Sequence, residues 1–185
     1  MTNINFKTME HIVFSNELKK IAPSPEAYLK LGHDEAFAQR MVDGYFVKER
    51  SSNVAAVYTD PIKNLVTTFD CTTVEIGMVT FSDGLEERGD YTLFGQFEAD
   101  DLVISEITME VIVLEMGIEH ILWHCAANSA CFLQALLIMA AFLRERGISD
   151  TLYDDEPANL LVAENCANVA GGEKYLDFYR MMLGF

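Results

Sequence analysis

Four apolar-rich segments follow one another between residues 91 and 125, and they decide the fold class. They read YTLFGQF (91–97), DDLVI (100–104), ITMEVIVL (107–114) and IEHILWHC (118–125). All four are rich in the β-branched and aromatic residues that favour strands. The third segment alternates well enough to be the hairpin mate of the second. We therefore expect a mostly antiparallel sheet in this part of the chain.

The residues before this region extend the predicted sheet. The same β-forming composition predicts three more strands, at Val54–Tyr58, Asn64–Phe69 and Val74–Phe81. Residues that favour turns separate them. Asp60-Pro61 predicts a turn, Ser82-Asp83-Gly84 predicts the end of a strand, and Glu86–Asp90 reads as an exposed loop.

Helical patterns stand on both sides of the strands. At the N-terminal side they predict a short helix within residues 9–21, one from Pro25 to about Leu31, and one capped by Asp34 that ends near Gly44. At the C-terminal side, Asn128 or Ser129 caps a long helix that ends at Gly147, and two more helices follow on either side of Gly171-Gly172. This segregated order predicts a single α+β domain over residues 1–185, with a mostly antiparallel sheet flanked by helices.

The net charge of −16 is concentrated in the predicted sheet. Residues 70–119 hold thirteen acidic side chains and one basic one, Arg88, whereas residues 1–69 are neutral overall. Such a chain lacks the clustered Lys and Arg that nucleic acids and anionic membranes attract, so neither is an expected partner. Acidity of this kind attracts basic proteins, although a solvated acidic surface is the simpler alternative.

The expected compartment is the cytoplasm. No signal peptide is visible at the N-terminus, and the longest apolar-rich run, Ala135–Leu143, is too short to span a bilayer. The four cysteines have no CxxC spacing, so we expect them to be buried thiols. They are Cys71, Cys125, Cys131 and Cys166.

Two histidines and a neighbouring cysteine are the strongest catalytic candidates. His120 and His124 stand four residues apart, a spacing that binds zinc on a helix, and Cys125 follows them. On a strand, however, residues four apart are about 13 Å from each other. A nucleophilic thiol at Cys125, or at Cys131 in the first turn of a helix, is an alternative to simple packing. An enzyme site around His120, His124 and Cys125 therefore remains the second hypothesis.

Other patterns give weaker indications of chemistry. The Asp100-Asp101 pair, with Glu98 and Glu106 nearby, is a possible cation site or acid–base pair but lacks the spacing of a calcium loop. Gly171-Gly172 precedes a helix without the Lys and Ser or Thr of a phosphate loop, and reads as a turn. We predict no metal, no cofactor and no catalytic residue.

Residues 94–143 resemble the SUKH superfamily, whose members occur as immunity proteins beside bacterial polymorphic toxins. The resemblance rests on a glycine followed by an Asp-Leu-aliphatic strand, a second aliphatic strand, and a helix start with the pattern N-S-x-x-F-x-x-x-L. Here these are Phe94-Gly95, Asp100–Ile104, Glu110–Leu114 and Asn128-Ser129 with Phe132 and Leu136. Gln96–Ala99 stands in place of the glycine-rich turn of the family, and Ala22–Pro25 lacks its tryptophan.

The resemblance implies an α+β fold and a protein that binds and neutralises a cognate toxin, with no catalytic residues to carry over. The charge distribution suggests a basic toxin, for example a nuclease, met by acidic loops. The predicted partner-binding residues are Asp83, Glu86, Glu87, Asp90, Glu98, Asp100 and Asp101. A regulatory adaptor with a different partner is a third hypothesis, and the sequence does not indicate the oligomeric state.

Overall fold

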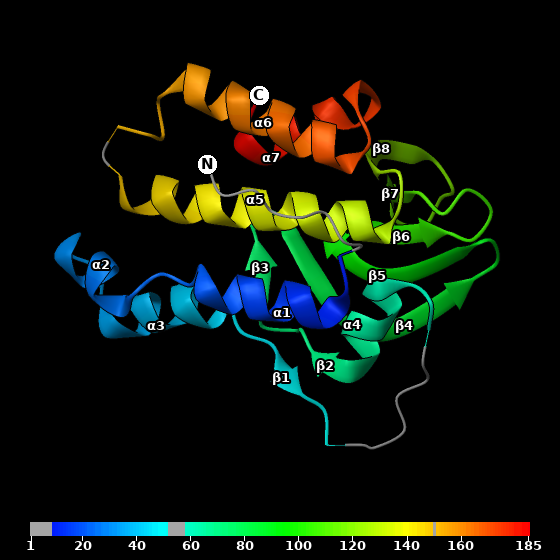
Figure 1. Cartoon of the computed structure of the whole chain (residues 1–185), viewed down its shortest axis with the longest axis horizontal. Helices are drawn as coiled ribbons and strands as arrows, with labels where there is room; N and C mark the ends of the chain where they lie inside the picture. The colour runs from blue at the N-terminus through cyan, green and yellow to red at the C-terminus, as the bar shows by residue number, and fades with distance from the viewer. Residues whose placement is uncertain (1–8, 52–57, 150) are drawn as a thin grey trace.

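The computed structural model describes residues 9–51, 58–149 and 151–185, and it confirms the α+β class (Figure 1). Helices precede and follow a six-stranded sheet, as predicted. All neighbouring strands of this sheet are antiparallel, and their order in space follows their order in the chain. The strands are β3 (Glu75–Ile76), β4 (Val79–Arg88), β5 (Tyr91–Phe97), β6 (Asp100–Ser105), β7 (Val111–Leu114) and β8 (Ile121–Ala126).

The helices cover one face of the sheet, and the longest of them runs across it (Figure 1). In Figure 1, α1 lies on one side of α5 and α6 on the other. A two-stranded sheet of β1 (Lys48–Glu49) and β2 (Phe69–Asp70) lies apart from the main sheet. The helices are α1 (His11–Lys20), α2 (Pro25–Lys30), α3 (Glu35–Asp43), α4 (Pro61–Thr68), α5 (Ser129–Ile148), α6 (Glu156–Ala170), the 3₁₀ turn η1 (Glu173–Tyr175) and α7 (Leu176–Leu183).

Helix α5 forms the centre of the core. Asn128 caps it, because its Oδ1 accepts a hydrogen bond from the backbone N–H of Cys131 at 2.9 Å. Phe132 and Leu136 are completely buried between the sheet and the other helices. Phe132 meets Phe94 of β5 edge to face, with ring centroids 5.9 Å apart, and also contacts Phe178 of α7. The C-terminal helix is thereby joined to the sheet through aromatic packing.

The predicted strand Asn64–Phe69 is wrong except for Phe69, the first residue of β2, since the other residues form most of helix α4. Asp60 and Pro61 are the reason: the Asp60 side chain accepts hydrogen bonds from the backbone N–H groups of Ile62 and Lys63, and proline suits the first helical position. Capping and the burial of Leu65 against the core outweigh the β-propensity of the segment. The predicted strand Val54–Tyr58 lies outside the described residues except for Tyr58.

The predicted turn at Ser82-Asp83-Gly84 does not end a strand. Strand β4 continues to Arg88, so the predicted loop Glu86–Asp90 is mostly strand as well. The turn-forming residues instead form an irregularity, because Phe81 pairs with Gly95 whereas Glu86 pairs with Leu93. A hairpin at Gly77 divides the predicted strand Val74–Phe81 into β3 and the start of β4.

Candidate functional site

The face of the sheet opposite the helices carries its own apolar cluster. Antiparallel pairing places Leu93 beside Val103 and Val103 beside Ile112, so these three side chains share one face. Leu114 completes the cluster, and Tyr91 packs against it. All of these residues belong to strands, and no α-helical residue is part of the cluster. We call this the outer face.

The seven predicted partner-binding residues fall into two groups along the chain. Asp83, Glu86, Glu87 and Asp90 are on β4 and the turn after it, whereas Glu98, Asp100 and Asp101 are at the turn from β5 to β6. The two groups meet at Arg88, which contacts both Glu86 and Asp101. The seven acids belong to strands as well as to turns, so they do not form a surface of loops alone.

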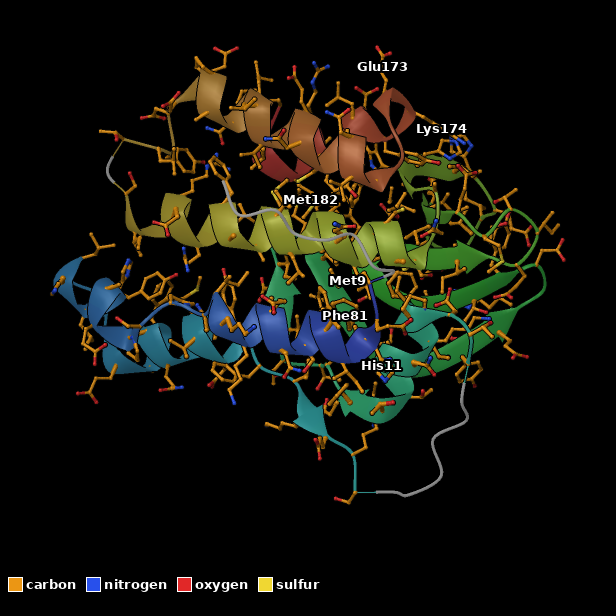
Figure 2. The ribbon with its side chains drawn as sticks, viewed as in Figure 1. Met9, His11, Phe81, Glu173, Lys174 and Met182 are labelled. Atoms are coloured by element: carbon orange, nitrogen blue, oxygen red, sulfur yellow. The ribbon has the colours of Figure 1, made fainter. Side chains whose placement is uncertain are left out.

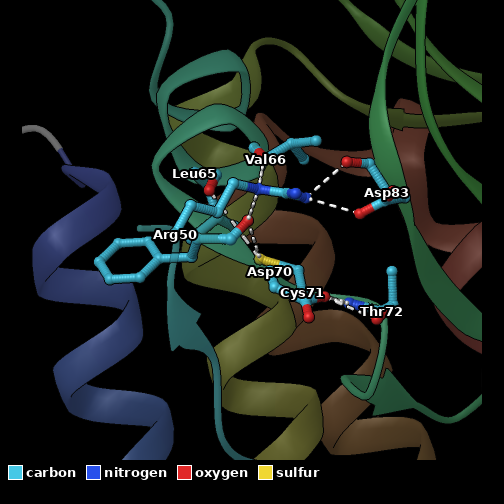
Figure 3. Close-up of polar contacts among 8 residues, drawn as sticks. Arg50, Leu65, Val66, Asp70, Cys71, Thr72 and Asp83 are labelled. Carbon is cyan, nitrogen blue, oxygen red and sulfur yellow. Dashed lines mark hydrogen bonds and ion pairs between the residues drawn. The ribbon is translucent and has the colours of Figure 1, made fainter. Parts of the chain in front are cut away.

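Three of the seven are engaged in ion pairs within the chain. Asp101 is 8% exposed and lies 2.5 Å from Nη1 of Arg88. Glu86 accepts hydrogen bonds from Nε and Nη2 of the same guanidinium at 2.8 and 2.9 Å, and these bonds lower the pKa of Glu86. Asp83 is paired with Arg50, which also donates to the backbone carbonyl of Phe69 (Figure 3). These carboxylates hold strands and loops together.

The other four acids differ in their exposure to solvent. Glu87, Asp90 and Glu98 are exposed, and no ion pair to them occurs among the residues that the structure describes. Asp100 is half-buried, and its Oδ1 accepts a hydrogen bond from the backbone N–H of Met116 at 3.0 Å. Asp100 therefore anchors the connection between β7 and β8 to the start of β6.

The β7–β8 connection carries residues that the sequence interpretation missed. The predicted strand began at Ile118, but β8 begins at Ile121, so residues 115–120 form an exposed loop. The loop presents Glu115 and Glu119 together with Met116 and Ile118, which are 63% and 55% exposed. Gly117, with a φ of +83°, is the sequence signal for this turn, because few other residues adopt that conformation.

A groove of about 230 Å³ lies between this loop and the outer face. Leu114 and Tyr91 from the strands contribute apolar lining, and the paired Arg88 and Asp101 contribute polar lining. Gly117, Ile118 and Glu119 supply the loop side. The Glu98, Asp100, Glu115 and Glu119 carboxylates lie at or beside the β5–β6 and β7–β8 connections, at the end of the sheet that we call the acidic end. The groove extends from this end to Arg88 and Tyr91.

His120, His124 and Cys125 do not form one site. His120 is exposed in the β7–β8 loop, and His124 lies on the outer face opposite Ile112. Cys125 points into the core from the next position of β8, where burial raises the pKa of its thiol well above the ordinary value. The strand geometry therefore places the thiol and the imidazole on opposite faces of the sheet.

His124 has a carboxylate neighbour that the sequence did not indicate. Its Nδ1 is 3.9 Å from Oε1 of Glu110, which accepts hydrogen bonds from Lys174 and from the Tyr175 hydroxyl. Figure 2 labels Lys174 on η1, the turn that contacts β8. Burial and the Lys174 charge lower the pKa of His124, and the Glu110 carboxylate offsets this only in part. Burial and the Glu110 carboxylate raise the pKa of Tyr175 to about 12.

The Glu110 cluster leads to a pH-dependent prediction. Burial alone would raise the pKa of Glu110, but the bonds from Lys174 and Tyr175 outweigh it and the pKa is lowered from 4.5. The ionised carboxylate therefore stabilises the fold above about pH 4.5, and this contribution is lost as the pH falls through the lowered folded-state pKa. We expect Glu110→Gln to lower the free energy of unfolding by about 1–2 kcal/mol at pH 7.

Urea unfolding of the native chain and of Glu110→Gln, at pH 7 and at acid pH, checks this prediction. The difference between the two proteins should shrink as the carboxylate becomes protonated. Glu164→Gln, on an exposed surface of α6, is the control and should change little. A difference that stays constant with pH would contradict the proposed role of the Glu110 charge.

The two remaining sequence motifs, Asp100-Asp101 and Gly171-Gly172, have structural roles in the fold. Asp100 and Asp101 diverge, one toward the Met116 backbone and the other toward Arg88. Gly171 ends helix α6 and, like Gly172, has a positive φ, so the glycine pair forms an interhelical turn. Within residues 9–51, 58–149 and 151–185, no group of three or more His, Cys, Asp or Glu side chains is arranged to hold a metal ion.

A second, larger cleft of about 510 Å³ lies away from all predicted residues. Tyr28, Arg40 and Tyr45 line it on the N-terminal side, and Glu75 and Leu143 line it on the other. The Tyr45 hydroxyl donates a hydrogen bond to the carbonyl of Ala140 at 3.0 Å, which joins the two sides. This cleft lies between the α2–α3 pair on one side and β3 with Leu143 of α5 on the other.

Over the part of the chain that the structure describes, none of the helices combines the length and the apolar character needed to cross a membrane. No protein-family model, curated protein or solved structure matches the chain.

Proposed function

We propose that this chain is a cytoplasmic immunity protein that binds and neutralises a cognate, basic toxin protein of bacterial origin. The observation that carries the proposal is unbalanced negative charge at the acidic end. Arg88 is shared between Glu86 and Asp101, and no Lys or Arg occurs between Arg88 and Arg144. The carboxylates of Glu98, Glu115 and Glu119 thus face solvent without a cation partner among the described residues.

Electrostatics favours a basic protein as the occupant of this surface. A nuclease toxin is basic because its substrate is a polyanion, and an acidic inhibitor presents similar charge to it. Complementary charge accelerates encounter and disfavours wrong partners, and the effect weakens as salt screens it. The resemblance to the SUKH superfamily supports the same role, since that role requires a surface rather than a catalytic site.

The seven acidic residues predicted from the sequence to bind the partner have different roles in the proposed complex. Glu98 belongs to the contact surface, and Glu87 and Asp90, which precede Arg88 and Tyr91 of the groove, lie at its edge. Asp100 shapes the loop of the acidic end through the Met116 backbone. Asp83, Glu86 and Asp101 act within the fold through Arg50 and Arg88.

Association kinetics with the purified product of the adjacent gene test the proposal. The triple variant Glu98→Lys, Glu115→Lys and Glu119→Lys should lower the association rate constant by about 10- to 100-fold at low salt, because steering is lost. The matched control changes the same net charge on the exposed helical side, with Asp154→Lys, Glu164→Lys and Glu173→Lys. The control should retain most of the rate, and equal losses in both variants would rule out a localised surface.

A further inference from the structure

The loop of the acidic end is held in place although its apolar side chains are exposed. The Glu115 N–H donates to the carbonyl of His120 at 2.9 Å, and the Ile118 N–H donates to the carbonyl of Glu115 at 3.1 Å. Asp100 adds the third bond, through the N–H of Met116. A loop fixed in this way loses little conformational freedom when it binds a partner.

Exposed apolar side chains gather on this fixed loop. Met116 and Ile118 are followed by Ile121, which is 39% exposed at the start of β8. Ile118 also lines the groove, beside Leu114 and Tyr91 of the outer face. A soluble domain gains nothing in stability by exposing a rigid group of this kind, whereas an interface uses such a group as its desolvated centre.

The acidic side chains around the groove determine which kind of partner it favours. Glu119 lines the groove itself, Glu115 precedes Met116, and Asp100 contacts the Met116 backbone. A second copy of this chain would bring the same carboxylates together, so like charges oppose self-association. A partner segment with an apolar side chain between Lys or Arg residues fits this site. The apolar side chain fills the groove, and the cations face the carboxylates of its rim.

We propose that this groove, with Met116, Ile118 and Ile121, is a docking site for a basic protein segment that inserts one aliphatic or aromatic side chain between Lys or Arg residues. The inference rests on the proposed function for the nature of the partner. It adds that affinity comes from apolar insertion, while the acidic rim governs the rate of encounter. The inserted side chain therefore controls dissociation.

A display library of random peptides, about twelve residues long, is the probe for this site. Panning against the whole chain should enrich basic peptides that carry a central apolar residue. Ile118→Ser should weaken the enriched peptides at least about 10-fold, mainly through faster dissociation. Ile12→Ser is the matched control, because Ile12 of α1 is 54% exposed, close to the 55% of Ile118. Met116→Ser is a second variant of the same site.

The outcomes separate this inference from the proposed function. Three results would overturn the docking site. Panning could enrich no peptides, it could enrich peptides without basic and apolar character, or Ile118→Ser and Ile12→Ser could weaken binding equally. A dimer of the native chain in sedimentation experiments that Ile118→Ser dissociates would also overturn it, because the occupant would then be a second copy. If Ile118→Ser leaves binding of the adjacent gene product unchanged, the proposed function stands. The groove is then not part of the contact surface.

Discussion

Gly95→Ala is expected to destabilise the chain by about 3 kcal/mol or more. A Cβ atom at this position would lie 2.2 Å from the backbone oxygen of Thr80, far inside van der Waals contact. The oxygen belongs to β4, which is paired with β5, so it cannot move without breaking the ladder at Phe81 and Gly95. Glycine therefore permits the close approach of the two strands at this irregular point.

Gly84→Ala is the matched control for this prediction. Gly84 lies on the same strand pair, is exposed, and has no atom within 4 Å of an added Cβ. Its substitution should change the free energy of unfolding by no more than about 0.5 kcal/mol. Urea unfolding monitored by circular dichroism measures both variants. Equal midpoints for Gly95→Ala and the native chain would contradict the described pairing of β4 and β5.

Local sequence patterns predicted much of the fold because local forces decide those elements. The strand over Tyr91–Phe97 has the predicted bounds, and Asn128 caps α5 as expected. Helix α4 was not predicted because Asp60-Pro61 and the β-branched residues that follow also fit a turn and a strand. Asp60 caps the helix and also accepts a hydrogen bond from the buried Ser129 hydroxyl at 2.6 Å, across 69 positions of sequence. Composition alone does not reveal such a contact.

The candidate site was predictable in charge but not in geometry. The concentration of acid in residues 70–119 is a property of the sequence, and so is the solitary Arg88. Which carboxylates Arg88 neutralises depends on strand pairing and side-chain reach, which the sequence does not reveal. The exposed loop at Met116 was hidden by the β-forming residues around it, although Gly117 marks the turn.

Co-expression with the adjacent gene is expected to have the largest effect of all, because the outcome is survival. If the adjacent gene encodes a toxin, inducing it alone should stop growth. The native chain should restore growth when both are expressed in the same cytoplasm, since a tight complex leaves little free toxin. The variant Glu98→Lys, Glu115→Lys, Glu119→Lys should rescue poorly at matched protein levels, and the control at Asp154, Glu164 and Glu173 should rescue as the native chain does.

Growth under this co-expression decides whether the chain neutralises a toxin and which surface it uses. We expect full rescue by the native chain and by the helical-side control, and loss of rescue when the acidic end is reversed. Arrest of growth despite equal amounts of the native chain would contradict the proposal that this protein neutralises a toxin. Rescue that persists after the acidic end is reversed would contradict the assignment of the contact to that end.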